Sequence, residues 1–399
     1  MAPYTTVLAE GLRQRGNQIR VLTAHPHYPT WCRFEGFSGW NARERSNGVA
    51  IQRMAHYIPR NPTPLRRALS ELTFGARLMF ERWGNPDIVV LVSPALMATG
   101  MALAVKRFKS PRAASVVWVQ DLYSEGVASS VGALSHFASV SKWIESATLR
   151  TADQVVVIHE HFRSALLELG VRPACIVVIP NWSNIDVLRA DGRTLTRERL
   201  GWSADETVVL HAGAIGAKQG LENVVNAARL ADSANAPIRF VLVGEGNRAA
   251  TVKAAAVGVK RVSFMGTVPQ AEFEQILAAA DVLLVNERPG VEDMSVPSKL
   301  TTYFASGLPV VAATVRTSTT AAVLGASQGG IRVEPGDPAA LLEAVGKLGA
   351  DPAMRRRFGE AGLAYRARML DRETAIDMYA QVLERSVREV RARRRGRFA

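Results

Sequence analysis

The chain has 399 residues, more than a single hydrophobic core usually supports, so we expect two domains. With 48% hydrophobic and 21% charged residues, the composition excludes a largely disordered protein. The formal net charge of +13 favours anionic partners, and the two cysteines, Cys32 and Cys175, exclude a disulfide framework or a thiolate metal site.

The first half of the chain alternates between helical and strand patterns, which predicts a doubly wound, mostly parallel sheet. The expected helices cover 5–14, 68–82, 140–150 and 160–169, and the expected strands cover 19–23, 88–92, 115–120, 154–158 and 175–179. Such a domain normally opens with a strand and a glycine-bearing loop, but here the first helix comes almost at once. We therefore expect a first domain that lacks its opening strand, and a recorded start roughly 15–20 residues late.

The uncharged stretch at 88–105 approaches the ~20 residues that span a bilayer. Ser93-Pro94 divides it into a β-branched strand and a helix rich in small residues, so we interpret it as core rather than membrane. The first residues mix acidic and basic side chains where a signal peptide needs an apolar run. The sequence therefore predicts a cytoplasmic protein.

A polar segment at 181–206 has the composition of an interdomain linker, and a second alternating run follows it. This run predicts strands at 207–211, 238–243, 262–265, 282–285 and 309–312, and helices at 338–348, 352–369 and 372–393. We predict a first domain over 1–185, a donor domain over 186–370, and a helix over 371–399 that returns to the first domain. Its arginine-rich end fits either a solvated helix terminus or contact with an anionic membrane.

A glycine-rich loop joins the strand at 207–211 to the next helix. Gly213 and Gly216 let the backbone approach a ligand closely, and N–H groups at the helix start can face phosphate oxygens. Lys218 adds a positive charge to the loop. The loop therefore predicts a diphosphate cradle, although glycine turns of this kind also form for conformational reasons alone.

Two further loops end at the same expected edge of the sheet. Gly244 and Glu245 follow the strand at 238–243, where Glu245 can accept hydrogen bonds from a ligand or be a solvated turn residue. Ser298 can cap the helix at 298–306 and Lys299 lies beside its free N–H groups, while a carboxylate at 292 or 293 can hold sugar hydroxyls. This combination favours a diphosphate-linked sugar over nucleic acid as the ligand.

Three residues of the first domain are candidates for the expected cleft. Asp121 follows a buried strand, where it would orient the acceptor hydroxyl or the donor sugar, or would cap a helix. His25 and His27 also end a strand. Because no third ligand lies nearby, we interpret them as loop-packing or acceptor-side residues and expect no metal.

A helical stretch in the first half mixes basic and apolar side chains, and a second basic cluster follows it. These residues fit either contact with an anionic membrane, which would reach a lipid-linked acceptor, or an ordinary amphipathic core helix. They are Arg66, Arg67, Leu72, Phe74, Leu78, Met79 and Phe80, followed by Lys106, Arg107, Lys109 and Arg112.

Four strings in the second half resemble the donor half of family-four retaining glycosyltransferases: AGAIGAKQGLE, VLVGEGN, VSFMGTVPQAEFEQILAAADVLLV and VPSKLTTYFASGLPVVAA. Two strings in the first half are similar to the colanic-acid and capsular-polysaccharide branch: APYTTVLAEGLRQRGNQIRVLTAHPHYP and VVIPNW. The resemblance covers nearly the whole chain. It implies a GT-B fold of two Rossmann-like domains facing a cleft, retention at the anomeric carbon, and neither an essential metal nor a cofactor.

The resemblance also assigns roles to residues. It implies that Lys218, with Gln219 beside it, binds the donor diphosphate, whereas an arginine common earlier in the family's loop falls near Ala214. The second of two family glutamates falls at Thr302, which can hydrogen-bond a ribose hydroxyl, and the first falls among residues 292–294. Lys218, Lys299 and the helix starts would stabilise the leaving diphosphate, which would then receive the acceptor's proton.

We therefore predict a retaining glycosyltransferase with Asp121, Lys218 and Glu292 as its catalytic residues. It would move a sugar from a nucleotide-diphosphate sugar to a glycan or polyprenyl-diphosphate-linked acceptor in cell-surface or extracellular polysaccharide biosynthesis, in the cytoplasm or on the inner membrane's cytoplasmic face. The alternatives are a sugar-nucleotide epimerase of similar fold and a truncated, non-catalytic nucleotide-sugar-binding protein. A nucleic-acid-binding protein would need stacking aromatic residues or a reading helix, and the sequence has neither.

Overall fold

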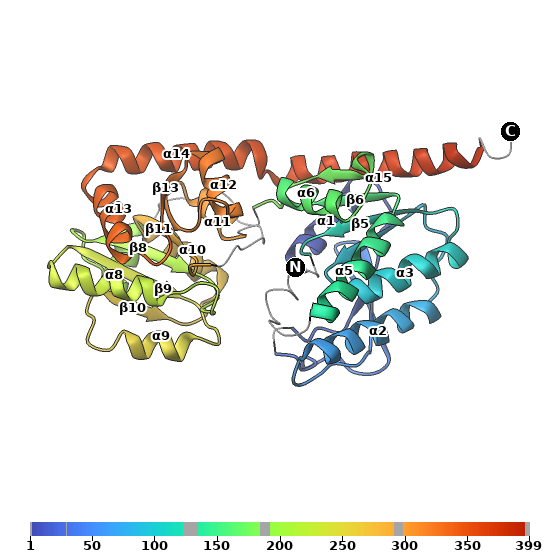
Figure 1. Ribbon diagram of the computed structural model, residues 1–399, viewed down its shortest axis with the longest axis horizontal. Helices are drawn as coiled ribbons and strands as arrows, with labels where there is room; N and C mark the ends of the chain where they lie inside the picture. The colour runs from blue at the N-terminus through green and yellow to red at the C-terminus, as the bar shows by residue number, and fades with distance from the viewer. Residues whose placement is uncertain (1, 29, 123–134, 184–191, 291–297, 396–399) are drawn as a thin grey trace. The chain divides into compact units, whose positions relative to one another are not determined.

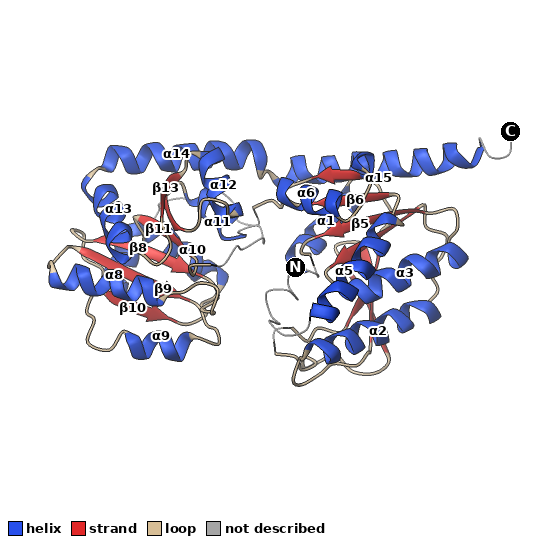
Figure 2. Cartoon of the chain, viewed as in Figure 1, coloured by secondary structure: helices blue, strands red, loops and turns tan. Residues whose placement is uncertain are grey.

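The computed structural model describes residues 2–28, 30–122, 135–183, 192–290 and 298–395. The chain divides into two compact units, in which helices and strands alternate (Figures 1 and 2). Unit 1 comprises residues 1–180 and 373–399, and unit 2 comprises residues 181–372. The boundaries predicted from the sequence were 185/186 and 370/371, which differ from these by a few residues.

Unit 1 holds two separate sheets. One has the strand order β1-β3-β2 and the other the order β4-β5-β6-β7, with all strands of the second sheet parallel. The strands are β1 (Arg20–Ala24), β2 (Asn41–Ser46), β3 (Val49–Met54), β4 (Ile88–Ser93), β5 (Ala114–Val119), β6 (Gln154–Val157) and β7 (Ile176–Val178). The helices are α1 (Ala2–Gln14), α2 (Pro64–Phe80), α3 (Leu96–Lys109), α5 (Ser135–Arg150), α6 (Glu160–Glu168) and the short η1 (Pro173–Cys175).

The stretch at 88–105 forms strand β4 and most of helix α3, so its interpretation as core is confirmed. Within the described part of the chain, no helix is both long and apolar enough to cross a membrane. Strands β5 and β6 are fully buried, because helices cover both faces of a doubly wound sheet. By contrast β1 and β4, each at the edge of its sheet, are only partly buried.

The hairpin of β2 and β3 was not predicted from the sequence. Its two strands pair antiparallel around Asn47 and Gly48, which both have positive φ angles of 47° and 81°. Asn-Gly is the residue pair that the tight turn of a two-residue hairpin favours. The local signal was therefore present, but the polar strand NARERS lacks the apolar alternation that marks a half-buried strand.

Helix α15 (Arg372–Arg395) packs on unit 1 along its length. Near its start, Ile376 lies against Gly11 of α1, and Tyr379 packs on Trp118 of β5 with ring centroids 5.0 Å apart. Toward its end, Arg391 pairs with Asp87 at 2.5 Å. Arg393 also pairs with Asp153 at 3.6 Å, and Arg394 donates to the carbonyl of Pro111. These arginines thus contact unit 1, but the side chains of Arg391 and Arg393 stay more than half exposed, which agrees with a solvated helix end.

Unit 2 contains one parallel sheet of six strands in the order β10-β9-β8-β11-β12-β13. The strands are β8 (Thr207–Ala212), β9 (Ile238–Val243), β10 (Val262–Met265), β11 (Val282–Asn286), β12 (Val310–Ala313) and β13 (Gly330–Val333). The helices are α7 (Arg193–Leu200), α8 (Glu222–Ser233), α9 (Ala249–Ala255), α10 (Gln270–Ala279), α11 (Ser298–Tyr303), η2 (Phe304–Ser306), α12 (Thr319–Ser327), α13 (Pro338–Ala350) and α14 (Pro352–Met369).

Alternate residues of strand β8 enter two different core clusters. Val209 packs in one cluster, with side chains of α8, α9 and α13, whereas Val208 and Leu210 pack in the other, with side chains of α10 and α11. Strand side chains point alternately to opposite faces, so helices must cover both faces of this sheet. The central strands are therefore held in the core, and the loops that follow them lie at one edge of the sheet.

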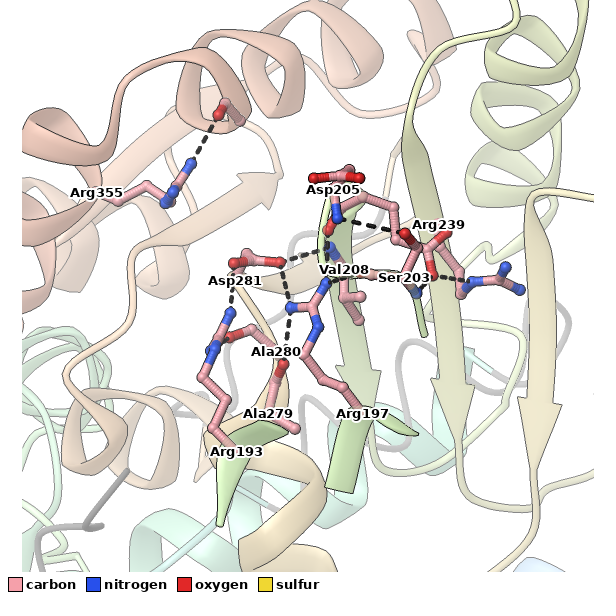
Figure 3. Close-up of polar contacts among 12 residues, drawn as sticks. Arg193, Arg197, Ser203, Asp205, Val208, Arg239, Ala279, Ala280, Asp281 and Arg355 are labelled. Atoms are coloured by element: carbon pink, nitrogen blue, oxygen red, sulfur yellow. Dashed lines mark hydrogen bonds and ion pairs between the residues drawn. The ribbon is translucent and has the colours of Figure 1, made fainter. Parts of the chain in front are cut away.

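An ion-pair cluster fastens the linker helix α7 to the sheet (Figure 3). Asp281, just before β11, accepts from Arg193 at 2.6 Å, from Arg197 at 3.0 Å and from the backbone N–H of Val208 at 2.8 Å. Arg197 is almost completely buried and also donates to the carbonyls of Ser203 and Glu206, each at 2.6 Å. Helix α7, which lies within the segment expected to be a linker, is thus part of unit 2.

Candidate active site

The carboxyl ends of β8 and β9 meet through two glycines. Gly213 and Gly244 have φ angles of 129° and 132°, which residues with side chains rarely adopt. The N–H of Gly213 donates to the carbonyl of Val243 at 2.9 Å, and a Cβ at Gly244 would overlap the carbonyl oxygen of Gly213. The two predicted loops are therefore packed against each other, as a shared ligand-binding edge requires.

The loop from Gly213 to Gly220 is held in shape by internal hydrogen bonds. The side-chain oxygen of Gln219 accepts from the N–H of Gly216 at 3.1 Å, so this group closes the loop. Asn286, buried at the end of β11, donates to the carbonyls of Gln219 and Gly220 at 2.7 and 3.0 Å. Sequence reasoning missed Asn286, because a single polar residue after VLLV does not reveal which loop it will meet.

A second set of contacts joins β8 to helix α11. The Nε2 atom of His211 lies 3.1 Å from Nζ of Lys299, and Nδ1 of His211 lies 3.1 Å from the carbonyl oxygen of Leu284. One turn further along α11, the buried hydroxyl of Tyr303 accepts from the N–H of Ala212 at 2.9 Å. These contacts bring Lys299 beside Gly213. The sequence predicted both residues at one edge of the sheet, but only because each of their loops was expected there.

The buried groups at this edge are neutral. Burial, together with the charge of Lys299, holds the pKa of His211 well below its ordinary value, and burial raises the pKa of Tyr303. The positive charge therefore resides on lysine side chains. Lys218 is exposed in the loop, whereas Lys299 is half-buried.

The remaining donor-side candidates have mixed outcomes. Glu245 is exposed and pairs weakly with Lys253 at 3.8 Å, which agrees with a solvated turn residue. Thr302 is half-buried, next to the buried Tyr303 on α11. Ser298 is the first residue of α11, while Glu292, the predicted catalytic carboxylate, lies outside the described residues.

One buried carboxylate at the end of β11 was not predicted. Glu287 accepts hydrogen bonds from the hydroxyls of Thr314 and Thr320, the second at 2.5 Å. The Thr314 hydroxyl also lies 2.7 Å from that of Ser318, which caps α12. Because both hydroxyls point to Glu287, we interpret this group as fixing the loops after β11 and β12 rather than as a free carboxylate.

The first-domain candidates all belong to unit 1. Asp121 is exposed after β5, and its carbonyl accepts from Ser93 at 3.3 Å. His25 has no exposed surface and packs near Phe37, which agrees with loop packing rather than with contact to an acceptor. His27 is half-buried, and its Nδ1 donates to the carbonyl of His25 at 2.9 Å.

Burial also shifts the pKa of two partly buried groups of unit 1 toward their uncharged forms. Burial lowers the pKa of His56 to about 4, and burial raises the pKa of Glu71 to about 7 although its carboxylate accepts from the N–H of Met97. For the helical stretch that was open to either a membrane face or an amphipathic core helix, Leu78 is buried in the core and Phe74 packs against the same cluster, so these two residues fit the core alternative. Among the described residues, no group of three or more His, Cys, Asp or Glu could hold a metal.

Comparisons with known proteins agree with this architecture. Residues 1–182 match the family described as Glycosyl transferase 4-like domain, and residues 206–351 match Glycosyl transferases group 1. Among solved structures, a sucrose-phosphate synthase from Thermosynechococcus elongatus has a TM-score of 0.70 at 20% identity and covers 96% of this chain and 92% of its own. The Anabaena protein HepE, in complex with UDP and glucose, has a TM-score of 0.63 at 16% identity, with coverages of 85% and 87%.

A relative of known name is more similar in sequence. WcaI of Escherichia coli (strain K12), named as a glycosyl transferase of colanic acid biosynthesis, is 32% identical over 321 residues, which cover 76% of this chain and 77% of WcaI. The structural likenesses establish the GT-B fold, and the sequence matches establish the activity class. The chain therefore belongs to the family-four glycosyltransferases and resembles their colanic-acid branch.

Proposed function

We propose that this glycosyltransferase takes its sugar from a nucleoside-diphosphate sugar and retains the anomeric configuration. The observation that carries the donor class is the edge where Gly213 and Gly244 meet beneath the ammonium group of Lys299. Glycines open this edge to close approach, and the nearby cation suits an anionic ligand. HepE, which has this fold, binds UDP and glucose in its crystal structure.

The proposed chemistry is electrostatic and needs no metal. As the glycosidic bond breaks, negative charge grows on the leaving diphosphate, where Lys218 and Lys299 would stabilise it. The phosphate oxygen would then take the proton of the acceptor hydroxyl. We keep Asp121 and Glu292 in this proposal as the groups that orient the acceptor and the sugar, and a glycan or lipid-linked acceptor of cell-surface polysaccharide synthesis as the acceptor class.

A donor screen tests the proposal directly. The full chain is incubated with UDP-, GDP- and ADP-sugars, with and without cell-envelope lipid extract, and the products are separated by mass spectrometry. Free nucleoside diphosphate that forms only with acceptor supports transfer, and the anomeric configuration of the product tests retention. An isomeric nucleotide sugar formed without acceptor would instead show the epimerase, and binding without turnover would show a non-catalytic protein.

We further propose that unit 1 rests on an anionic membrane through helix α2. Its outward face is apolar, with Leu65, Leu69, Leu72, Met79 and Phe80 all exposed at helical spacing. A cavity of about 570 Å³, which Trp40 and Tyr57 help to line, opens beside the end of the helix at Phe80. We call the exposed apolar residues Leu65, Leu69, Leu72, Met79 and Phe80 the α2 face. Apolar side chains that insert into the membrane interface would hold the enzyme on the membrane that contains the lipid-linked acceptor.

Unpaired cations around the α2 face support an anionic partner. Arg33, Arg60 and Arg66 are exposed, and none has an ion pair with a residue that the structure describes. In the second basic cluster, by contrast, Lys106 pairs with Asp153 and Lys109 donates to the carbonyl of Glu81, so we leave that cluster out.

Vesicle sedimentation tests the membrane proposal without any knowledge of the substrate. The wild-type chain should sediment with phosphatidylglycerol vesicles and much less with phosphatidylcholine vesicles. Leu69→Glu with Leu72→Glu should abolish sedimentation, whereas Val257→Glu, at a residue of unit 2 that is 82% exposed, should not. Equal sedimentation of both variants, or concentration-dependent dimers without vesicle binding, would contradict the α2 face as a membrane contact.

A further inference from the structure

A cavity of unit 1 lies between helix α2, the end of β3 and the loop that precedes β2. Its volume of about 570 Å³ is within the range of small-molecule sites, roughly 300–1,000 Å³. Each of the three segments supplies an aromatic side chain and a side chain with nitrogen donors or acceptors: Trp40 and Arg33 before β2, Tyr57 and His56 after β3, and Phe80 and Arg77 on α2. None of the described residues that line the cavity is acidic.

Trp40 is 66% exposed, and yet its position is fixed from one side. The guanidinium carbon of Arg77 lies 4.1 Å from the centre of the indole ring, in cation–π contact. The carbonyl of Trp40 accepts from the N–H of Ala55 at 3.0 Å and from Arg77 at 3.3 Å. Because Arg77 covers only one face of the ring, the other face is a flat apolar surface that is already held in place for a ligand.

The two arginines of the cavity differ in how their charges are paired. Arg77 donates to Oδ1 of Asn41 at 2.7 Å and pairs with Glu81 at 3.5 Å, and both side chains of this pair are almost buried. Its charge is therefore largely compensated, and its contacts hold Trp40. Arg33 is exposed and has no ion pair with a residue that the structure describes. Arg33 is thus the group that an anionic part of a ligand would meet in this cavity.

We propose that this cavity binds a sugar unit that carries a carboxylate, such as a hexuronic acid, in the acceptor glycan. The apolar C–H face of a pyranose ring would pack on the free face of Trp40, and its hydroxyls would hydrogen-bond to His56 and Tyr57. The carboxylate would accept from the guanidinium of Arg33. This inference rests on the proposed function, since it requires a glycan as acceptor. It adds the charge of the acceptor and the place where it binds.

An alkyl chain with a phosphate head would also match aromatic walls and a free guanidinium. A flexible chain, however, packs on any apolar surface, whereas a sugar ring needs a flat one of fixed orientation. The contact of Arg77 with Trp40 supplies that fixed surface, so we favour the sugar. The lipid phosphate is kept as an outcome of the test.

Saturation-transfer NMR on the full chain, without membranes or donor sugar, tests the site. The probes are methyl β-glucuronide, methyl β-glucoside and dodecyl phosphate below its micelle concentration, each with and without UDP. We expect the wild type to bind the glucuronide about tenfold more tightly than the glucoside. Arg33→Gln should reduce the affinity for the glucuronide to that for the glucoside and leave the glucoside unchanged.

Tryptophan variants separate the platform from nonspecific contact. Trp40→Ala should weaken both glycosides by about tenfold or more, and Trp40→Phe, which keeps a flat ring, by much less. Trp143→Ala is the matched control, because Trp143 is 70% exposed on α5 of the same unit but does not line the cavity, and it should weaken neither. Since Trp40 is exposed, its variants should keep the wild-type melting temperature.

The outcomes separate this inference from the proposed function. No glycoside binding with or without UDP, no preference for the glucuronide, or unchanged binding by Trp40→Ala would overturn this inference alone, because none of these measurements depends on donor turnover. Binding of dodecyl phosphate in place of the glucuronide would overturn it and assign the cavity to a lipid chain. Failure of every nucleotide sugar in the donor screen would instead overturn the proposed function and leave the glucuronide site standing.

Discussion

The two units differ in how they hold some of their partly or fully buried ionisable groups. In unit 2, Asp281 accepts from two arginines and a backbone N–H, Glu287 accepts from two threonines, and His211 lies between a carbonyl and Lys299. In unit 1, burial lowers the pKa of His56 to about 4 and raises that of Glu71 to about 7, so His56 is uncharged and Glu71 is about half protonated at neutral pH.

The sheets differ in the same sense. Unit 2 has one six-stranded sheet, whose central strands β8 and β11 are almost completely buried, whereas unit 1 divides its strands between a sheet of three and a sheet of four. Paired charges on a buried sheet hold a binding edge in one geometry, which suits recognition of a fixed diphosphate. Neutral, desolvated groups leave unit 1 sensitive to pH. The comparison therefore predicts a preformed donor-side edge and a more responsive first domain.

The largest effect should come from breaking the Asp281 cluster. Asp281→Ala leaves Arg197 buried without its carboxylate, so we expect the free energy of unfolding of unit 2 to fall by about 4 kcal/mol. Urea denaturation followed by the fluorescence of the buried Trp202 would measure this loss. Asp205→Ala, at an exposed aspartate in the loop before β8, should change little. Equal losses of unfolding free energy in the two variants would contradict the view that paired buried charges stabilise unit 2.

A smaller effect should follow from Gly244→Ala. The new Cβ would overlap the carbonyl of Gly213 and would force alanine into a conformation with a φ of 132°, which together should cost about 3 kcal/mol. Gly258→Ala is a matched control, because Gly258 also has a positive φ, 80°, but has open space around it. We expect only Gly244→Ala to lose nucleoside diphosphate binding in calorimetry. Retention of binding would show that the donor-side edge is less rigid than the contacts indicate.

Local signals explain why much of unit 2 could be predicted. Gly213, Gly244 and the strands before them lie in short runs whose pattern depends only on neighbouring residues. Contacts set by tertiary packing could not be predicted in this way. His211 and Lys299 are separated by 88 positions, and they meet only because β8 pairs with β11 and α11 folds back onto both.

Unit 1 also has features that a local sequence pattern could not predict. The apolar pattern of α2 predicts a helix but not which face turns inward, so it could not show that Leu78 is buried in the core. The tail arginines likewise have a local charge pattern, and only the fold shows that Asp87 and Asp153 lie close enough to pair with them. The neutral state of Glu71 depends on α3 meeting α2, which no local pattern contains.

The smallest effect should appear in the pH dependence of unit 1. The pKa of Glu71 is about 7 in the folded chain, against 4.5 for an ordinary glutamate, so its contribution is fully present below pH 4.5 and is lost as the pH rises through 7. Glu71→Gln removes this loss but can still accept from Met97. Between pH 4.5 and 8 the variant should therefore gain about 2 kcal/mol over the wild type, after allowance for partial exposure.

His56 acts in the opposite direction, with stability lost as the pH falls from 6.5 toward 4, but its contribution cancels in the difference between the two proteins. Thermal melting across this pH range would measure that difference, and parallel curves for both proteins would show that Glu71 is ionised in unit 1, as the carboxylates of unit 2 are in their ion pairs.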